Sequence, residues 1–308
     1  MRALVQRVDS TAADSTRCTS ARTAPSCHAT RREGQNEQVI ELRSGRASCT
    51  VAPAHGARLA QLTIDDHPML VDRHDDSLGW GCYPMVPYAG RVRNGQLSFH
   101  GQLHELPRRL PPHAIHGTVF EKEWTLEESS TRHCRLVTDL APGWPFGGTV
   151  VHDVELHDDR LTMRLAVTAT ADMPVQIGWH PWFRKPADRR LGFAASFRRD
   201  HDGIALPERV HPAALGPDGT NDDCFADPDG VLRITVDHHD LVLSSSCPYW
   251  VVYDQPPSAT CVEPQSGPPN GINDDPYVLP AGRTLTHEFT IAWSAHADHA
   301  ERATRSGQ

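Results

Sequence analysis

The sequence lacks the short motifs that mark several common enzyme classes. No Walker loop, GxGxxG fingerprint, GxSxG elbow or HExxH helix occurs among its 308 residues. Those motifs carry phosphate, dinucleotide, acyl-transfer and zinc chemistry. Their absence removes the usual nucleotidase, dehydrogenase and hydrolase interpretations.

Paired cysteines and a basic charge excess are also missing. The eight cysteines are scattered and no CxxC pair occurs, which excludes zinc-ribbon and thioredoxin-like sites. The 30 Lys and Arg stand against 39 Asp and Glu, which gives a net charge of −9. A net-negative chain without a basic stripe is a poor partner for nucleic acid or an anionic membrane.

Long apolar runs are absent as well. No run approaches the ~20 residues that span a bilayer. The N-terminal region has arginines but no apolar stretch of ~7–15 residues, which a secretory signal requires. We therefore expect a cytoplasmic protein with reduced, mostly buried thiols.

Composition divides the chain into three parts. Residues 1–36 are rich in Arg, Ser, Thr and Ala, and such a segment buries too little surface to offset its ordering entropy. We therefore expect a disordered N-terminal tail. Residues 37–295 contain short β-type runs bounded by Gly, Pro or Asp and predict a single domain. Residues 296–308 are expected to form a disordered C-terminal tail.

Alternation of apolar residues within this domain predicts strands. The clearest hairpin runs from Val150 to Val167, with its turn at residues 157–160. A second hairpin is predicted over residues 232–243, with its turn at residues 238–240. Proline (25) and glycine (22) are frequent, and no window holds a long helical stripe. The predicted fold is all-β, a large antiparallel sandwich or barrel with few short helices.

Two residues are candidates for general acid–base chemistry. Glu263 precedes Pro264, and His180 precedes Pro181. The residue before a proline is restricted to extended backbone, so both side chains start from defined positions, which we place at strand ends. A Glu and a His that face each other across one cavity suit proton transfer to a small polar substrate. Each residue is also compatible with an ordinary structural role.

Other polar residues lie among chain breakers. Arg91 follows a glycine, and its planar head suits hydroxyls or a ring oxygen. His116 or His113 could donate a hydrogen bond to a hydroxyl. Asp222 and Asp223 form a carboxylate pair, which is equally compatible with a turn.

Strand parity separates the two faces around His180. Trp179 shares parity with Val175 and Ile177, so we expect it to face the core and His180 to face the opposite side. The cluster DHHD at residues 237–240 is the strongest candidate metal site. Neighbouring strand residues point to opposite faces, however, so we predict no metal there.

Five short pieces, taken in order, resemble the aldose 1-epimerase (galactose mutarotase) family. The pieces are PYAGR at residues 87–91, HG at 116–117, GWHPWF at 178–183, DDCF at 222–225 and VEPQ at 262–265. Each piece is short, but the ordered set with both His-Pro and Glu-Pro is specific. With flanking strands, the resemblance covers roughly residues 38–295.

The resemblance implies a β-supersandwich and a cofactor-free, metal-free interconversion of α and β sugar anomers. In that family the residue equivalent to Glu263 takes the proton from the anomeric O1 hydroxyl. The residue equivalent to His180 protonates the ring oxygen as the C1–O5 bond opens. By the same resemblance Arg91, His116 and Asp222 hold the sugar. The expected partner is a small sugar, and the expected assembly is a monomer or homodimer.

The match departs from the galactose enzymes at one motif. His116 and Gly117 are followed by Thr118, where galactose mutarotases commonly have a second glycine. The preferred aldose therefore stays open. One alternative is a hexose-6-phosphate 1-epimerase, which needs a basic cluster for the phosphate. The nearby candidates are Arg93, Arg108 and Arg109. A second alternative is a non-catalytic sugar-binding protein.

Overall fold

The computed structural model describes residues 39–295, and both predicted tails lie outside the described residues. Two large antiparallel sheets and three two-stranded ribbons account for the strands of this part. Helical structure among these residues is limited to α1 (Gly271–Asp274) and two short 3-10 turns, η1 (Pro53–His55) and η2 (Arg93–Gly95). Within residues 39–295 no helix has the length and apolar character needed to cross a membrane. The predicted all-β supersandwich with few short helices is confirmed.

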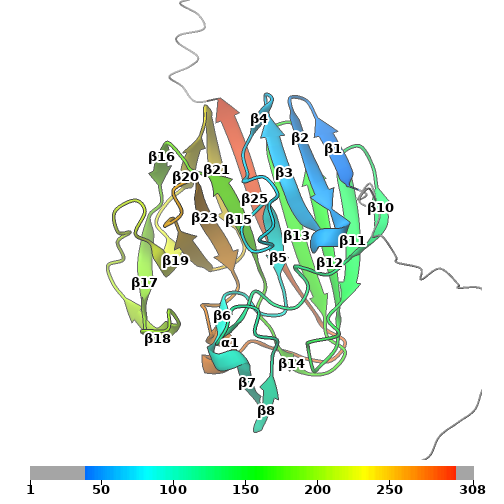
Figure 1. Cartoon of the computed structure of the whole chain (residues 1–308), viewed down its shortest axis with the longest axis vertical. Helices are drawn as coiled ribbons and strands as arrows, with labels where there is room; N and C mark the ends of the chain where they lie inside the picture. Colours follow the sequence, from blue (N-terminus) through cyan, green and yellow to red (C-terminus); the bar gives the residue numbers. More distant parts are fainter. Residues whose placement is uncertain (1–38, 296–308) are drawn as a thin grey trace, which may run out of the picture. The chain divides into compact units, whose positions relative to one another are not determined.

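The larger sheet has eleven strands, ten of them in the order β1-β2-β3-β5-β15-β23-β22-β19-β17-β18, with β4 paired to β3. Figure 1 shows β1 to β3 beside β5, β15 and β23. The strand bounds are β1 (Ile40–Ser44), β2 (Ala47–Ala52), β3 (Arg58–Ile64), β4 (His67–Pro68), β5 (Cys82–Met85), β15 (Gly178–Arg184), β17 (Phe193–Arg199), β18 (Ala205–Val210), β19 (Asp222–Pro228), β22 (Tyr249–Tyr253) and β23 (Ala259–Gln265).

The smaller sheet has eight strands in the order β10-β11-β12-β13-β25-β21-β20-β16. Its bounds are β10 (Thr125–Ser129), β11 (His133–Asp139), β12 (Thr149–Leu156), β13 (Arg160–Thr168), β16 (Asp188–Arg190), β20 (Leu232–Val236), β21 (His239–Ser245) and β25 (Thr284–Ala295). The two-stranded ribbons pair β6 (Arg91–Val92) with β9 (Ala114–Ile115), β7 (Gln96–Phe99) with β8 (Gln102–Glu105), and β14 (Met173–Pro174) with β24 (Val278–Leu279).

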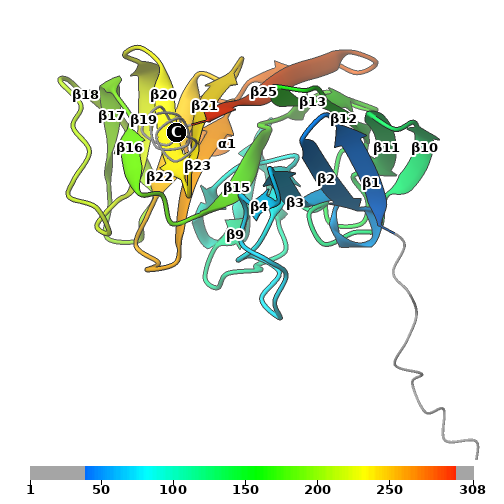
Figure 2. The ribbon, with the colours of Figure 1, turned by 90° about the horizontal axis from the view of Figure 1, so that it is seen from above.

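The hydrophobic core lies between the two sheets, which Figure 2 shows side by side. Phe289 of the smaller sheet contacts Trp179 and Trp250 of the larger one, with ring centroids 6.0 and 6.2 Å apart. The indole Nε1 of Trp179 also donates to Nε2 of His152 on β12, at 3.3 Å. Trp179 therefore faces the core, as its parity predicted.

The first predicted hairpin is confirmed, and the second needs a correction. Strands β12 and β13 alternate buried and less buried residues on both arms, around the predicted turn. In the second hairpin, Val236 pairs with His239, so the turn consists of Asp237 and His238 alone. Asp237 has a positive φ of 55°. The first central residue of a two-residue hairpin turn, whether type I′ or II′, requires a positive φ. His239 and Asp240 therefore belong to β21 and not to the turn.

His180 and Glu263 lie inside central strands and not at strand ends, which corrects the prediction. The antiparallel register of β15 and β23 runs through Gly178↔Gln265 and resumes at Trp182↔Cys261. Continued between these pairs, the same register places His180 opposite Glu263. Prolines 181 and 264 lie in this interval and have no N–H to donate. The hydrogen bonds between the two strands can therefore be interrupted here without leaving an unpaired N–H at either position.

Candidate active site

A cavity of about 310 Å³ opens on the face of the larger sheet to which His180 points. Its floor begins with a row of cross-strand neighbours from adjacent strands. Tyr83 pairs with His180, Glu263 pairs with Val251, and Val251 pairs with Cys224. All of these side chains line the cavity. The row explains how residues far apart in sequence come to share one site.

A second row lies two residues along the same strands. Trp182 pairs with Cys261, Cys261 with Tyr253, and Tyr253 with Asp222. Trp182, Tyr253 and Asp222 line the cavity, whereas Cys261 is fully buried. Because strand side chains alternate between faces, both rows point to the side opposite the core.

The walls of the cavity come from ribbons and loops around this floor. Arg91 begins β6, His116 follows β9, and Arg199 ends β17. The structure thus brings every predicted site residue to one cavity: Arg91, His116, His180, Asp222 and Glu263. The carboxylate alternative Asp223 lines the cavity as well.

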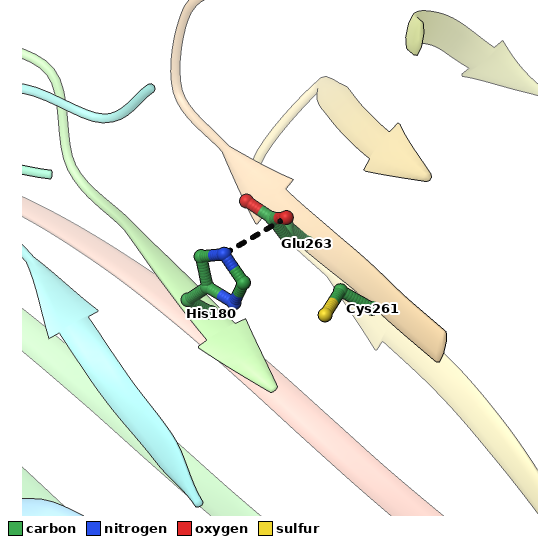
Figure 3. A group of neighbouring side chains, drawn as sticks. All are labelled: His180, Cys261 and Glu263. Carbon is green, nitrogen blue, oxygen red and sulfur yellow. Dashed lines mark ion pairs between the residues drawn. The ribbon is translucent and has the colours of Figure 1, made fainter. Parts of the chain in front are cut away.

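His180 and Glu263 touch each other directly (Figure 3). Nε2 of His180 lies 3.2 Å from Oε1 of Glu263, and both side chains are buried. The amide of Gln265 donates to Oε2 of Glu263 at 3.1 Å, which orients the carboxyl group. The sequence interpretation had the two residues face each other across one cavity. In the structure they are in direct contact.

Burial changes the protonation of both members of this pair. Desolvation, followed by the charge of Asp222, raises the pKa of Glu263 well above its ordinary value despite the Gln265 hydrogen bond. Desolvation also lowers the pKa of His180 well below its ordinary value, with His116 and Arg58 adding to the shift. Burial therefore disfavours the charged form of both groups, and the two titrate as a coupled pair.

Aromatic rings hold the imidazole of His180. The ring of Tyr83 stacks on it with centroids 4.8 Å apart and an interplanar angle of 25°. The ring of Trp182 stacks on it at 5.2 Å and 12°. These contacts leave the imidazole little rotational freedom, so its nitrogen stays aimed at Glu263.

His116 reaches the cavity through an unusual backbone conformation. It has a left-handed φ of 60°, and its N–H donates to the carbonyl of Gly90 at 3.1 Å. A Cβ on Gly117 would lie 1.9 Å from the carbonyl oxygen of Val86, so only glycine fits there. Thr118 donates its N–H to the same oxygen at 2.8 Å and needs no glycine. Burial lowers the pKa of His116 to about 3, so its ring is neutral.

An arginine–aspartate cluster lies beside the pair formed by His180 and Glu263. Oδ2 of Asp222 is 2.9 Å from Nη1 of Arg199 and 3.7 Å from Nη1 of Arg91. Arg199 also contacts Asp223, at 3.0 Å, and Arg91 donates to the carbonyl of Gly203 at 3.1 Å. Desolvation raises the pKa of Asp222 in spite of the two arginines. The cluster presents fixed donors and acceptors to a polyhydroxylated ligand.

Sequence reasoning missed several residues of this cavity. Only the pairing of the strands shows that Tyr83 and Tyr253 belong to the cavity. No motif in the sequence indicates Arg199. Gln265 could have been found, because it lies two residues from Glu263 on the same strand face. His113 is not part of the cavity lining, and its Nδ1 accepts a hydrogen bond from the N–H of Asn94.

Two groups of described residues have donors close enough together for a metal ion. The first is His180, Cys261 and Glu263, and the second is Asp200, His201 and Asp202. Burial and the nearby Glu263 raise the pKa of the Cys261 thiol well above its ordinary value, so it is protonated and a poor ligand. In the second group, both carboxylates are paired with Arg93.

The arginines considered for a phosphate have other partners. Arg93 pairs with Asp200 and Asp202, Arg108 with Glu105, and Arg109 with Glu121. None of the three is among the residues that line the cavity. These three arginines therefore do not form the basic cluster in the cavity that the 6-phosphate alternative requires.

A two-sheet antiparallel sandwich with this cavity on one outer face defines a galactose mutarotase-like fold. The chain belongs to the aldose 1-epimerase family, whose profile matches residues 38–292. A curated relative, the uncharacterized protein YihR of Escherichia coli K12, is 25% identical over 291 residues, covering 82% of this chain and 92% of the relative.

Solved structures support the same fold. Galactose 1-epimerase from Lactobacillus acidophilus NCFM superposes with a TM-score of 0.71 at 16% identity, covering 86% of this chain and 97% of that one. The GalM/aldose epimerase homologue from C. elegans gives a TM-score of 0.72 at 15% identity, covering 84% of this chain and 99% of that one. At these identities the likeness establishes the fold alone.

Proposed function

We propose that the protein is an aldose 1-epimerase that interconverts the α and β anomers of a free, uncharged aldose. The observation that carries the proposal is the buried contact of 3.2 Å between His180 and Glu263 at the floor of an open cavity. Sugar binding alone does not require an acid–base pair of this kind. Anomerisation does, because one oxygen must lose a proton while another gains one.

In the proposed reaction Glu263 accepts the proton of the anomeric O1 hydroxyl, and His180 donates a proton to the ring oxygen. The C1–O5 bond breaks and leaves an open-chain aldehyde. Rotation about C1–C2 presents the other face of the aldehyde, and the ring closes with the two proton transfers reversed. Each positioned transfer contributes roughly 10²–10⁴-fold in rate.

The proton count of the pair matches this reaction. One proton shared between Glu263 and His180 leaves one group able to accept and the other able to donate. Burial favours a shared proton on Glu263 over an ion pair, and the separation of 3.2 Å allows this proton to pass between Glu263 and His180. In each turnover, whichever anomer is the substrate, Glu263 serves as base during ring opening and as acid during ring closure, and His180 does the opposite.

The charges of the cavity favour an uncharged sugar over a sugar phosphate. Its lining includes two cations, Arg91 and Arg199, and both contact Asp222. A phosphate would have to displace these contacts and face the carboxylates of the cavity. Hydroxyl groups, by contrast, both donate and accept, and so they suit an arginine–aspartate cluster.

The test is a panel of freshly dissolved α-aldoses, each with and without a 6-phosphate, followed by polarimetry at neutral pH. We expect accelerated equilibration of at least one free aldose and weaker acceleration of its phosphate. Preferred turnover of the phosphate would favour the hexose-6-phosphate 1-epimerase. Calorimetric binding of a sugar without any acceleration would favour the non-catalytic binding protein.

A further inference from the structure

Arg58 is a buried cation at the start of β3. Its guanidinium donates to three backbone carbonyls, those of Trp80 at 2.8 Å, Ser77 at 2.7 Å and His55 at 3.4 Å. Gly81 accommodates its stem, because a Cβ there would lie 3.0 Å from Cδ of Arg58. Desolvation lowers the pKa of Arg58 to about 10, because burial disfavours the charged guanidinium. The surrounding chain nevertheless fixes the guanidinium in one place.

The fixed guanidinium is connected to the acid–base pair through one aromatic ring. Cζ of Arg58 lies 4.5 Å from the ring centroid of Tyr83, and the same ring stacks on His180 at 4.8 Å. The strands that carry Arg58, Tyr83, His180 and Glu263 are consecutive in the larger sheet: β3, β5, β15 and β23. Arg58 is not among the residues that line the sugar cavity, and it borders a neighbouring hollow instead.

We propose that Arg58 is a positioning residue for the acid–base pair, and that through the ring of Tyr83 it fixes the imidazole of His180 against Glu263. The inference rests on the proposed function, since it assigns a role within that reaction. The geometry supplies the reason. A guanidinium held by three carbonyls and packed on the ring restrains Tyr83, and Tyr83 restrains the imidazole.

Arg58 also acts on His180 through its charge. The pKa of His180 is lowered first by burial, then by His116 and then by Arg58. The titratable or charged groups that face His180 from the surrounding elements are Tyr83 on β5, His116 after β9, Cys261 and Glu263 on β23, and Arg58 on β3. Among these groups Arg58 is the permanent cation, so its removal makes protonation of His180 easier.

Two substitutions separate position from charge. Arg58→Met removes the positive charge and also the hydrogen-bonded guanidinium that restrains Tyr83. We expect kcat to fall roughly ten- to hundredfold, with KM within about twofold of wild type. The acid limb of its pH–rate profile should move to higher pH, because His180 takes up a second proton more readily. Arg58→Lys keeps the charge without the planar fork, so kcat should fall while the acid limb stays in place. The matched control is Arg73→Met, which removes the other guanidinium near Trp80 and should leave both quantities unchanged.

A double-mutant cycle tests the route through Tyr83. In a Tyr83→Leu background, Arg58→Met should lower kcat much less than it does alone, because the connecting ring is gone. Equal losses in both backgrounds, or an Arg58→Lys variant with wild-type kcat, would overturn the proposal. If Arg58→Met does not fold, the Lys variant and its cycle with Tyr83→Leu decide the matter.

An NMR titration of the His180 ring in the sugar-free protein separates this inference from the proposed function. We expect the His180 pKa to rise in Arg58→Met and to stay in place in Arg73→Met. If the His180 pKa rises in Arg58→Met but the wild-type protein turns over no aldose, the influence of Arg58 on His180 is supported and the epimerase assignment is rejected. An unmoved titration, together with equal losses of kcat in the wild-type and Tyr83→Leu backgrounds, would reduce Arg58 to a structural residue and reject this inference.

Discussion

Two of the protein's histidine–carboxylate contacts have nearly equal length and opposite character. His133 and Asp153 on the smaller sheet are 3.1 Å apart, and their side chains are 32% and 19% exposed. His180 and Glu263 on the larger sheet are 3.2 Å apart, and their side chains are 6% and 3% exposed. Distance alone would assign both the same chemistry.

The environments of the two pairs decide otherwise. Desolvation acts to raise the pKa of Asp153, but hydrogen bonds from Arg135 and His133 outweigh it, and the pKa is lowered. Within residues 39–295 no guanidinium forms an ion pair with Glu263, and burial raises its pKa. The partly exposed pair is therefore an ion pair or a charge-assisted hydrogen bond, whereas burial disfavours the charged forms of both members of the other pair. Only the second is suited to acid–base catalysis.

The largest expected difference between the pairs is in catalysis. His180→Gln should lower kcat/KM for anomerisation by roughly 10²–10⁴-fold, because the proton donor to the ring oxygen is lost. His133→Gln removes the histidine of the other pair and should leave the rate unchanged. Polarimetry on a fresh α-aldose measures both. Similar rates in the two variants would show that the comparison has no bearing on function.

A smaller effect is expected at the carboxylate beside the buried pair. Asp222→Asn should raise KM by roughly ten- to a hundredfold, because it removes a charged acceptor that also fixes Arg91 and Arg199. Asp223→Asn, which alters the neighbouring contact with Arg199, should raise KM less. Initial rates over a range of sugar concentrations give the two values. A larger effect at Asp223 would transfer the sugar-binding role to that residue.

The carboxylates of the two pairs should affect stability with opposite signs. The pKa of Glu263 is raised in the folded state. The carboxyl group therefore lowers the free energy of unfolding as the pH rises above 4.5, its ordinary pKa. Glu263→Gln removes that loss and should stabilise the protein at neutral pH. The folded pKa of Asp153 is lowered, so it stabilises the fold above 3.8 and stops doing so in acid.

Asp153→Asn should therefore destabilise the protein at neutral pH by about 0.5–1 kcal/mol, with a smaller loss in acid. Urea unfolding of both variants at about pH 5 and about pH 8 measures these differences. If Glu263→Gln destabilised the protein at both values, the carboxyl would be ionised in the folded state.

The pH dependence of the rate sharpens the comparison further. With ordinary pKa values, a Glu base and a His acid would give a narrow optimum between about pH 4.3 and about pH 6.5. The raised pKa of Glu263 and the lowered pKa of His180 instead predict a broad plateau through neutral pH. Activity should fall in acid, where the pair gains a second proton, and in alkali, where it loses its only one. A narrow pH optimum of the rate would contradict the raised pKa of Glu263 and the lowered pKa of His180.

The sequence predicted the fold class because the smaller sheet alternates cleanly. Strands such as β13, with one buried face, show the pattern directly. The site strands do not, because β23 is buried along its whole length, with the core on one face and the cavity on the other. That is why Glu263 was placed at a strand end rather than inside a strand.

Motifs located the predicted site residues, but not their neighbours. His-Pro and Glu-Pro indicated two positions, and only the register of β15 and β23 shows that they lie opposite each other. Tyr83 and Arg199 come from strands whose pairing depends on long-range topology, which a single sequence does not encode in any local pattern. The protonation of the pair depends on burial from every side, and so it required the structure.

The most direct test of the account is the rate of anomerisation by Glu263→Gln, measured by polarimetry beside Asp153→Asn at neutral pH. Gln preserves the size and the hydrogen-bonding edge of the side chain but cannot take the proton from O1. We predict a loss of roughly 10²–10⁴-fold for Glu263→Gln and a wild-type rate for Asp153→Asn. A folded Glu263→Gln variant that equilibrates the sugar at the wild-type rate would contradict the assignment of the buried pair as the catalytic centre.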